Sequence, residues 1–406
     1  VRKRKIFIPA MIDHTQGIAA AFQACGVEAE VLPPSDRETL ALGRKLTSGK
    51  ECYPCILTTG DMVRMVQRPD FDPDRMAFFM ASGNGPCRFG QYHRFHRLVL
   101  DELGYANVPI YAPDQTDSLH NELESVAGKD FTRLGWQAVV AIDIILKKLL
   151  ETRPYEIYPG EAQEAYQVCL DDICDTVRNR RDLVECMKRC RDRQVGVRVR
   201  NMGSKPAIGV VGEIYTRTNE FSNEDTIRNI ERFGGEVWMP PVAEWLLYLN
   251  QANMAVSRQQ RRWKDHYKRK LIDHVQHKDK HKLEETYRGF VRNFHEPLIT
   301  ETYDYAEPYL HRSFEGEAVL SIGKSKDFVL KGASGIINIL PFTCMPGNVV
   351  TALLKRFRED HKNIPVLDIA CDGQEQTNAL ARLEAFMYQV HQFRNELKEE
   401  EKVLTL

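Results

Sequence analysis

Short apolar runs alternate with amphipathic stretches along the first 111 residues. The runs at 6–10, 27–32, 76–81 and 108–111 have the composition of buried strands, and the stretches at 13–25, 38–46, 61–66 and 91–103 have that of helices. This alternation predicts a parallel, doubly wound α/β sheet. Ligands of such sheets lie beyond the carboxyl ends of the strands.

A second alternating pattern begins at Pro206. Strands are predicted at 207–212, 236–239, 318–322, 335–340 and 364–372, and a final helix at 378–397. The segments 26–34 and 234–241 match in order: a glycine, a strand with a glutamate, and a double proline. This match indicates that the two halves of the chain are duplicated.

Helical periodicity fills the rest of the chain. The stretches 131–151, 161–193 and 242–296 are amphipathic and long. The expected organisation is a Rossmann-like domain at 1–117, a helical subdomain at 118–205, and a second Rossmann-like domain at 206–406 with a helical insertion at about 242–300. Each domain thus carries a helical insertion, and a cleft between the two domains is expected.

The candidate chemistry lies in cysteine-bearing turns near the ends of apolar runs. Cys52 and Cys55 follow Gly49, Cys87 follows Gly85-Pro86, and Cys344 precedes Pro346-Gly347. Cys371 ends the last predicted strand. Cysteines on loops at strand ends are suited to ligate an iron–sulfur cluster.

The Cys52-x2-Cys55 pair alone leaves other interpretations open. It also fits a redox-active pair like that of thioredoxin, or half of a zinc site. Structural zinc usually takes cysteine pairs close together in sequence, whereas these turns are far apart, which favours a cluster. Any of the cysteines could instead be a small buried hydrophobic residue.

The remaining five of the ten cysteines are not assigned to the cluster. Cys25, in an Ala-rich helix, and Cys169 are interpreted as small buried hydrophobic residues. Cys174, Cys186 and Cys190 have helical spacings that could bind a metal, but their Asp and Arg neighbours favour an ordinary solvated helix.

Two residues beside Cys87 are candidates for contact with a cofactor. Arg88 would offset the charge of a cluster or bind an anionic substrate, although it could simply pair with a carboxylate. Gly85 belongs to a glycine-rich segment, 83–86, that resembles a phosphate loop but lacks the Lys-Ser/Thr of a P-loop.

The composition argues against nucleic-acid and membrane partners. With 56 Lys and Arg against 57 Asp and Glu, the chain lacks the positive charge of a typical nucleic-acid binder. No apolar run reaches the length of a membrane span, and the basic start lacks the apolar core of a signal peptide. A cytoplasmic location without nucleic-acid or membrane partners is expected, and there cysteines are free thiols, metal ligands or nucleophiles.

The cysteine segments 49–55, 84–92 and 341–347 resemble the C-terminal part of the large acyl-CoA dehydratase activase-related proteins. That part is similar to the subunits of 2-hydroxyacyl-CoA dehydratases and benzoyl-CoA reductases and to double-cubane cluster proteins. The resemblance covers nearly the whole chain, and the ending 364–386 resembles the end of the dehydratase subunits.

This resemblance implies two Rossmann-like domains that hold a [4Fe-4S] or double-cubane [8Fe-9S] cluster. By position, Cys52, Cys87 and Cys344 correspond to the three cysteines of a dehydratase cubane. Cys55 and Cys371 are extra, and a double cubane would need a sixth ligand. The resemblance also implies an ATP-hydrolysing activase as electron donor, and a homodimer or heterodimer. The nucleotide fold of the activase itself is absent from the sequence.

Three functions remain open at this point. The first is a low-potential iron–sulfur reductase or dehydratase-like component that acts on a small or acyl-CoA substrate. The second is a non-enzymatic electron-transfer or scaffold subunit. The third is a zinc-stabilised binding protein. The substrate is not readable from the sequence.

Overall fold

The computed structural model describes residues 4–83, 85–113, 119–374 and 378–404. Two compact units share the chain. Unit 1 comprises Val1–Leu146, Ala165–Arg193 and Pro241–Phe290, and unit 2 comprises Lys147–Glu164, Gln194–Pro240 and Val291–Leu406. The linear boundaries expected from the sequence, at 117 and 205, stay predictions.

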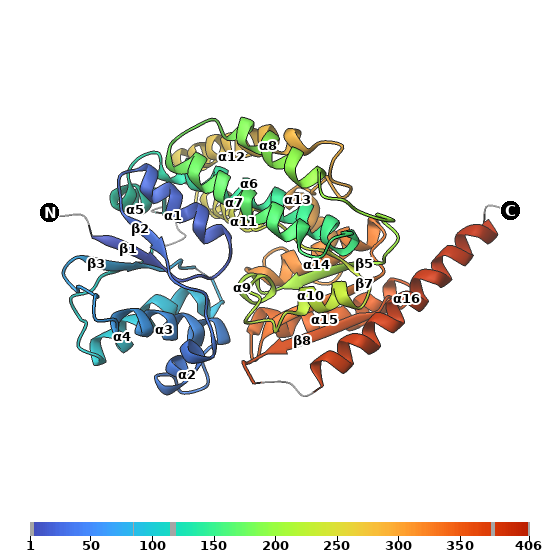
Figure 1. Ribbon diagram of the computed structural model, residues 1–406, viewed down its shortest axis with the longest axis horizontal. Coiled ribbons are helices and arrows are strands. Elements are labelled where there is room, and N and C mark those ends of the chain that lie inside the picture. Colours follow the sequence, from blue (N-terminus) through green and yellow to red (C-terminus); the bar gives the residue numbers. More distant parts are fainter. Residues whose placement is uncertain (1–3, 84, 114–118, 375–377, 405–406) are drawn as a thin grey trace. The chain divides into compact units, whose positions relative to one another are not determined.

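Unit 1 contains a four-stranded, all-parallel sheet in the order β2-β1-β3-β4 (Figure 1). Each strand coincides with an apolar run that the sequence singles out, to within one residue, so the α/β prediction is confirmed here. The strands are β1 (Lys5–Ile8), β2 (Ala29–Val31), β3 (Met76–Phe79) and β4 (Ile110–Tyr111).

Alternate side chains of this sheet pack against helices on its two faces. Phe7 of β1 and Phe78 of β3 are neighbours in the sheet and share an apolar cluster with Met62 of α3 and Leu100 of α4. Phe79 meets Phe22 of α1 in an edge-to-face contact on the other face. The helices and the short 3-10 turn that connect these strands are α1 (His14–Ala24), α2 (Arg37–Lys45), α3 (Tyr53–Val66), η1 (Arg88–Gln91) and α4 (Tyr92–Glu102).

Two glycines allow α2 and α3 to pack closely. A Cβ on Gly60 would lie 1.8 Å from the carbonyl oxygen of Thr39, and one on Gly43 would lie 2.0 Å from that of Ile56. Only residues without a side chain fit at these two contacts. The close packing fixes α3, whose first turn carries Cys52 and Cys55.

Unit 2 repeats the arrangement of the first sheet. Its four parallel strands have the order β6-β5-β7-β8, so the inner pair and the two edges correspond position by position to those of unit 1 (Figure 1). The same strand order in both sheets supports the duplication predicted from the sequence. The strands are β5 (Ala207–Gly212), β6 (Glu236–Trp238), β7 (Gly335–Pro341) and β8 (Val366–Cys371).

Helices cover both faces of the second sheet. Gly209 of β5 lies under Phe328 of α14, whereas Gly335 of β7 lies under Phe386 and Val390 of α16. The helices and 3-10 turn of unit 2 are η2 (Arg153–Tyr155), α9 (Ile214–Thr218), α10 (Thr226–Arg232), α13 (Ile299–Ala306), α14 (Glu317–Leu330), α15 (Met345–Asp360) and α16 (Ala379–Leu404).

One predicted strand is wrong. Residues 318–322 belong to α14, which runs from Glu317 to Leu330. The run Ala-Val-Leu-Ser-Ile is apolar because α14 is buried on most sides, and a buried helix cannot be told from a buried strand by a five-residue run. The strand that follows α14 is β7, which was predicted separately at 335–340.

The remaining helices form the helical part of the chain. The predicted helix at 161–193 is two helices, α7 and α8, separated by a turn in which Arg180 has a φ of 52°. Within the described residues, no helix is both long and apolar enough to cross a bilayer. The helices are α5 (Leu119–Ala127), α6 (Phe131–Thr152), α7 (Glu161–Arg178), α8 (Leu183–Val195), α11 (Ala243–Gln259) and α12 (Trp263–Glu284), with the 3-10 turn η3 (Glu285–Tyr287).

Candidate metal centre

Cys52 and Cys55 lie in the first turn of α3, not in a loop before a helix at 61 as the sequence suggested. Cys52 is the N-cap, with extended φ and ψ angles of −62° and 144°, and Pro54 occupies the first turn, where its missing N–H costs nothing. The backbone N–H of Cys55 donates to the carbonyl of Cys52 at 2.8 Å. A spacing of three residues places both side chains on one face of the helix.

Both thiols are buried in an apolar environment. Cys52 and Cys55 belong to the cluster that includes Met80 and Tyr92. Burial, and secondly the neighbouring Cys52, raises the pKa of the Cys55 thiol to about 12. Without a metal, Cys55 therefore keeps its proton at neutral pH, and a metal that binds there must displace it.

Cys87 lies in the segment that follows β3, and this segment reaches the Cys52 turn. Arg88 donates from Nη1 to the carbonyl oxygen of Lys50 at 2.7 Å. The positive charge of Arg88 also acts on Cys55, lowering the pKa of that thiol against the larger effect of burial. The structure therefore brings two of the three predicted cysteine turns together in unit 1.

Cys87 itself is half-buried and caps the short helix η1. The backbone N–H of Phe89 lies 3.5 Å from the Cys87 sulfur and donates to it. A Cβ on Gly90 would lie 2.0 Å from the carbonyl oxygen of Gly83, so only glycine fits at position 90. Gly85 is exposed and has a φ of 90°, as a turn glycine does, and its neighbour Asn84 lies outside the described residues.

Cys344 and Cys371 lie at the carboxyl edge of the second sheet, on neighbouring strands. Cys344 follows β7 and caps α15, while Cys371 is the last residue of β8 and pairs with Pro341 in the sheet register. The backbone N–H of Phe342 donates to the Cys371 carbonyl at 2.8 Å. Both cysteines are buried, and burial, followed by the charge of Glu224, raises the pKa of Cys371 to about 12.

The helices α3 and α15 begin with the same sequence pattern. Cys52-Tyr53-Pro54 opens α3, and Cys344-Met345-Pro346 opens α15; in both, an extended cysteine is the N-cap and the proline lies in the first turn. The N-terminal end of a helix carries partial positive charge, which stabilises a thiolate. A Cys-x-Pro helix start is therefore a feature shared by both cysteine sites.

A carboxylate pair also lies at the carboxyl edge of the second sheet, and the sequence analysis missed it. Glu213 directly follows β5, and its carboxylate accepts hydrogen bonds from the backbone N–H groups of Tyr215 and Thr216. Glu317, in the first turn of α14, accepts from the N–H of Ile214 at 3.0 Å. The position of Glu213 after a parallel strand was a usable signal.

The environment of Glu317 favours its protonated form. Burial and the neighbouring charge of Glu213 raise the pKa of Glu317 to about 8. In the unfolded chain Glu317 has its ordinary pKa of 4.5 and loses its proton above that pH. In the folded protein it keeps the proton up to a higher pH. This carboxyl group therefore weakens the folded state as pH rises from about 4.5 to about 8.

Replacing Glu317 with glutamine should reduce this loss of stability. We expect the free energy of unfolding of the wild-type protein to fall more steeply between pH 5 and pH 8 than that of Glu317→Gln, as measured by urea unfolding. Glu315→Gln, at an exposed neighbouring position, is the matched control and should keep the wild-type slope. Equal slopes for all three proteins would show that Glu317 is ionised in the folded state.

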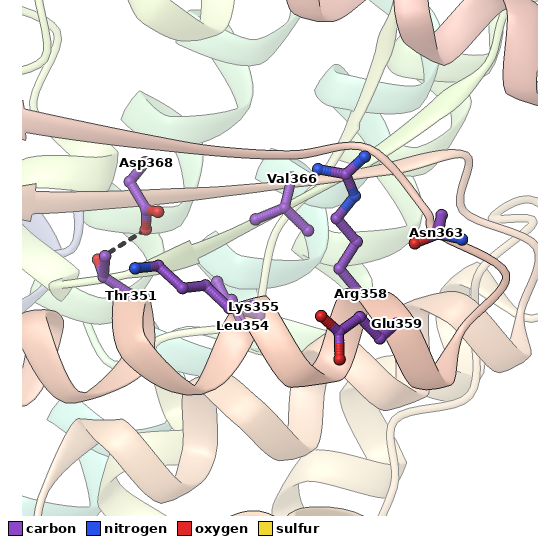
Figure 2. A pocket seen from close by; sticks show the side chains of 8 residues that line it. All are labelled: Thr351, Leu354, Lys355, Arg358, Glu359, Asn363, Val366 and Asp368. Atoms are coloured by element: carbon purple, nitrogen blue, oxygen red, sulfur yellow. Dashed lines mark hydrogen bonds between the residues drawn. The ribbon is translucent and has the colours of Figure 1, made fainter.

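A cavity of about 420 Å³ opens between α15 and the edge strand β8 (Figure 2). Thr351 donates to Asp368 at 2.7 Å, and Asn338 donates to the same carboxylate oxygen at 2.8 Å. The lining carries both positive and negative side chains and no thiol, so the cavity is separate from the predicted cysteine sites. The lining residues are Thr351, Leu354, Lys355, Arg358, Glu359, Asn363, Val366 and Asp368.

The compact ligand group in the described part of the chain is not among the predicted cysteines. It consists of Asp172, Cys186 and Cys190, whose ligand atoms all lie within 4.8 Å of one another. Cys174, Cys186 and Cys190 are buried, so their interpretation as residues of an ordinary solvated helix is wrong, whereas Cys169 is buried as expected. The burial of Cys186 and Cys190 depends on how α8 packs against α7, which the spacing along α8 does not show.

A scan of the chain against protein-family models found no match, and a search among curated proteins found no significant match. The resemblance described from the sequence stays a prediction.

Proposed function

We propose that the chain is an iron–sulfur protein whose cluster is held by thiolates of Cys52, Cys55, Cys87, Cys344 and Cys371. One observation carries the proposal: the hydrogen bond from Arg88 to Lys50 joins the Cys87 segment to the start of α3. Two cysteine turns 32 residues apart in sequence (Cys55 to Cys87) thus lie side by side within one unit. In unit 2, the segment after β7 that carries Cys344 likewise lies beside Cys371, because Pro341 pairs with Cys371 in the sheet.

The chemistry of these residues fits such a group. Cysteine thiolates are the usual ligands of iron–sulfur clusters. The apolar side chains around Cys52 and Cys55 exclude water, and the hydrogen bond from Phe89 to the Cys87 sulfur is of the kind that tunes a cluster's potential. Arg88 supplies a positive charge beside the thiolates. A cluster bound here would supply one-electron transfer at low potential.

The resemblance to the dehydratase family supports a more specific role. We assign the chain to low-potential electron transfer, or to a reductase component, reduced by a separate ATP-hydrolysing activase, with a [4Fe-4S] or double-cubane [8Fe-9S] cluster. In this proposal the chain works as a homodimer or heterodimer on a small or acyl-CoA substrate. The second candidate is a non-enzymatic electron-transfer or scaffold subunit. Turnover with a reduced activase separates the two.

The first experiment is the iron and acid-labile sulfide content of anaerobically purified protein, with EPR spectra after reduction. About four irons per chain indicate one cubane, and about eight indicate a double cubane. Zinc in place of iron, after reconstitution with iron and sulfide, would favour the zinc-stabilised protein and overturn the proposal. Absence of any metal after reconstitution would overturn it as well.

A further inference from the structure

Helices α7 and α8 pack against each other through a group of cysteines that the proposed cluster does not use. Cys186 and Cys190 lie one turn apart on α8, and their sulfur atoms are 4.0 Å apart. Asp172 of α7 places a carboxylate oxygen within 4.8 Å of both sulfurs. Two thiols and a carboxylate thus converge from two helices.

The packing around this group holds it in place. The Cys169 sulfur lies 3.5 Å from the Cys190 carbonyl oxygen, and the Cys190 sulfur lies 3.8 Å from the Cys169 carbonyl oxygen. Cys186 is 0% exposed and Cys190 is 1% exposed. Hydrophobic packing accounts for the buried thiols, and an ion pair with Arg189 holds the Asp172 carboxylate beside them.

The charges of this group suit a divalent cation. Arg189 of α8 makes hydrogen bonds of 3.0 Å to each carboxylate oxygen of Asp172. If both thiols ionise, the two thiolates and the carboxylate carry three negative charges. Arg189 balances one of them, and a divalent ion balances the other two. The thiols lose their protons to solvent as the metal binds.

The distances and ligand types suit zinc better than magnesium or calcium. Two Zn–S bonds of about 2.3 Å at a tetrahedral angle hold the sulfurs about 3.8 Å apart, close to the distance found between Cys186 and Cys190. Thiolates favour zinc over magnesium or calcium. The side chain of Asp172 is 30% exposed, so its side of the group is open to solvent.

We propose that Cys186, Cys190 and Asp172 bind one zinc ion, with water in the fourth position. The ion would fasten α7 to α8 and is independent of the iron–sulfur cluster. Because its ligands come from two helices that a turn at 179–182 separates, zinc should stabilise this helix pair in the folded chain and bind the unfolded chain far more weakly.

The test is zinc binding by the full chain, prepared anaerobically, dialysed against Zn²⁺ and desalted. We expect Cys186→Ser and Asp172→Asn each to hold one zinc ion fewer per chain than the wild type. Cys174→Ser is the control, since Cys174 is a buried cysteine on α7 outside the group, and it should keep the wild-type zinc content. Circular dichroism checks that each variant is folded. If Cys186→Ser does not fold, Asp172→Asn still tests the site, because Asp172 is partly exposed and its substitution disturbs the packing less.

Cobalt gives a second readout at the same site. Thiolate-to-cobalt charge-transfer bands should appear with Co²⁺ in the wild type and lose intensity in Cys186→Ser but not in Cys174→Ser. Zinc should also raise the melting temperature of the wild type more than that of Asp172→Asn. Unchanged zinc content in both ligand variants would overturn the site. The iron content of these variants should equal that of the wild type, so the zinc site and the cluster succeed or fail separately.

Discussion

Cys87→Ala is expected to remove most of the iron from the anaerobically purified protein. Cys87 is one of three cysteines that correspond to the ligands of a cubane, and loss of one thiolate ligand leaves a cluster exposed and labile. Cys87 is also only half-buried, so its truncation should change the free energy of unfolding of the cluster-free protein by about 1 kcal/mol or less. Loss of iron would then reflect a missing ligand and not an unfolded protein. Iron and sulfide analysis, together with urea unfolding, measures both effects.

Cys25→Ala provides the matched control for this experiment. Cys25 is likewise half-buried, lies in unit 1, and ends α1 away from the cysteine turns. This variant should keep the iron content of the wild type. If Cys87→Ala also keeps its iron, Cys87 is a structural residue and the proposed ligand set is wrong. Repeating the measurement with Cys344→Ala shows whether a residue of unit 2 is needed for the same iron.

The second large effect is expected from Lys324→Met, which should lower the free energy of unfolding by about 3–5 kcal/mol. Lys324 is 0% exposed and donates to Glu296 at 2.5 Å and to Asp327 at 2.8 Å. Removing its charge leaves two buried carboxylates with less compensation. Lys147 still contacts Glu296, and Lys331 still contacts Asp327, which limits the loss. Urea unfolding at neutral pH measures the difference.

Two further variants define the cause. Lys326→Met, on the same helix but half-buried, removes a lysine whose hydrogen bond goes to His361 and should cost less. Adding Glu296→Gln to Lys324→Met should recover part of the lost stability, because one uncompensated charge is removed. A loss in the single variant that the double variant does not reduce would point to altered packing of the methionine and not to charge.

The same network predicts sensitivity to acid. Burial opposes the ionisation of Glu296, but the charges of Lys147 and Lys324 outweigh it and hold the pKa of Glu296 well below its usual range. A lowered pKa contributes stability that is complete above the unfolded value of 4.5 and disappears as pH falls further. The difference between the wild type and Lys324→Met should therefore shrink in acid.

The fold was predictable wherever local pattern and tertiary environment agree. The strands β1, β3, β5 and β7 lie in short apolar runs bounded by glycine, proline or polar residues, and each was predicted. The run at 318–322 was misassigned because α14 is buried on nearly all sides, which erases the periodicity that marks a helix.

The candidate cysteines were chosen from the sequence alone, and the structure adds their local geometry. Glycine and proline mark the chain reversals after β3 at Cys87 and after β7 at Cys344, whereas Cys52 lies between helices α2 and α3 and not at a strand end. The sequence did not show that Cys52 and Cys55 share one helical turn, because the flanking glycines suggested a loop. Nor did it show the Glu213–Glu317 pair, which exists only because β5 and α14, about 100 residues apart, meet at one edge of the sheet.

The division of the chain into two units has a consequence for its synthesis. Residues up to 290 contribute to unit 1, while unit 2 takes segments from 147 onward. During translation, the first sheet emerges from the ribosome long before α11 and α12, which complete its unit. Neither unit can finish folding on an early nascent chain, and no single proteolytic cut releases either one whole. Contacts so distant in sequence slow folding, so nascent chains should depend on chaperones until the last of these helices has emerged.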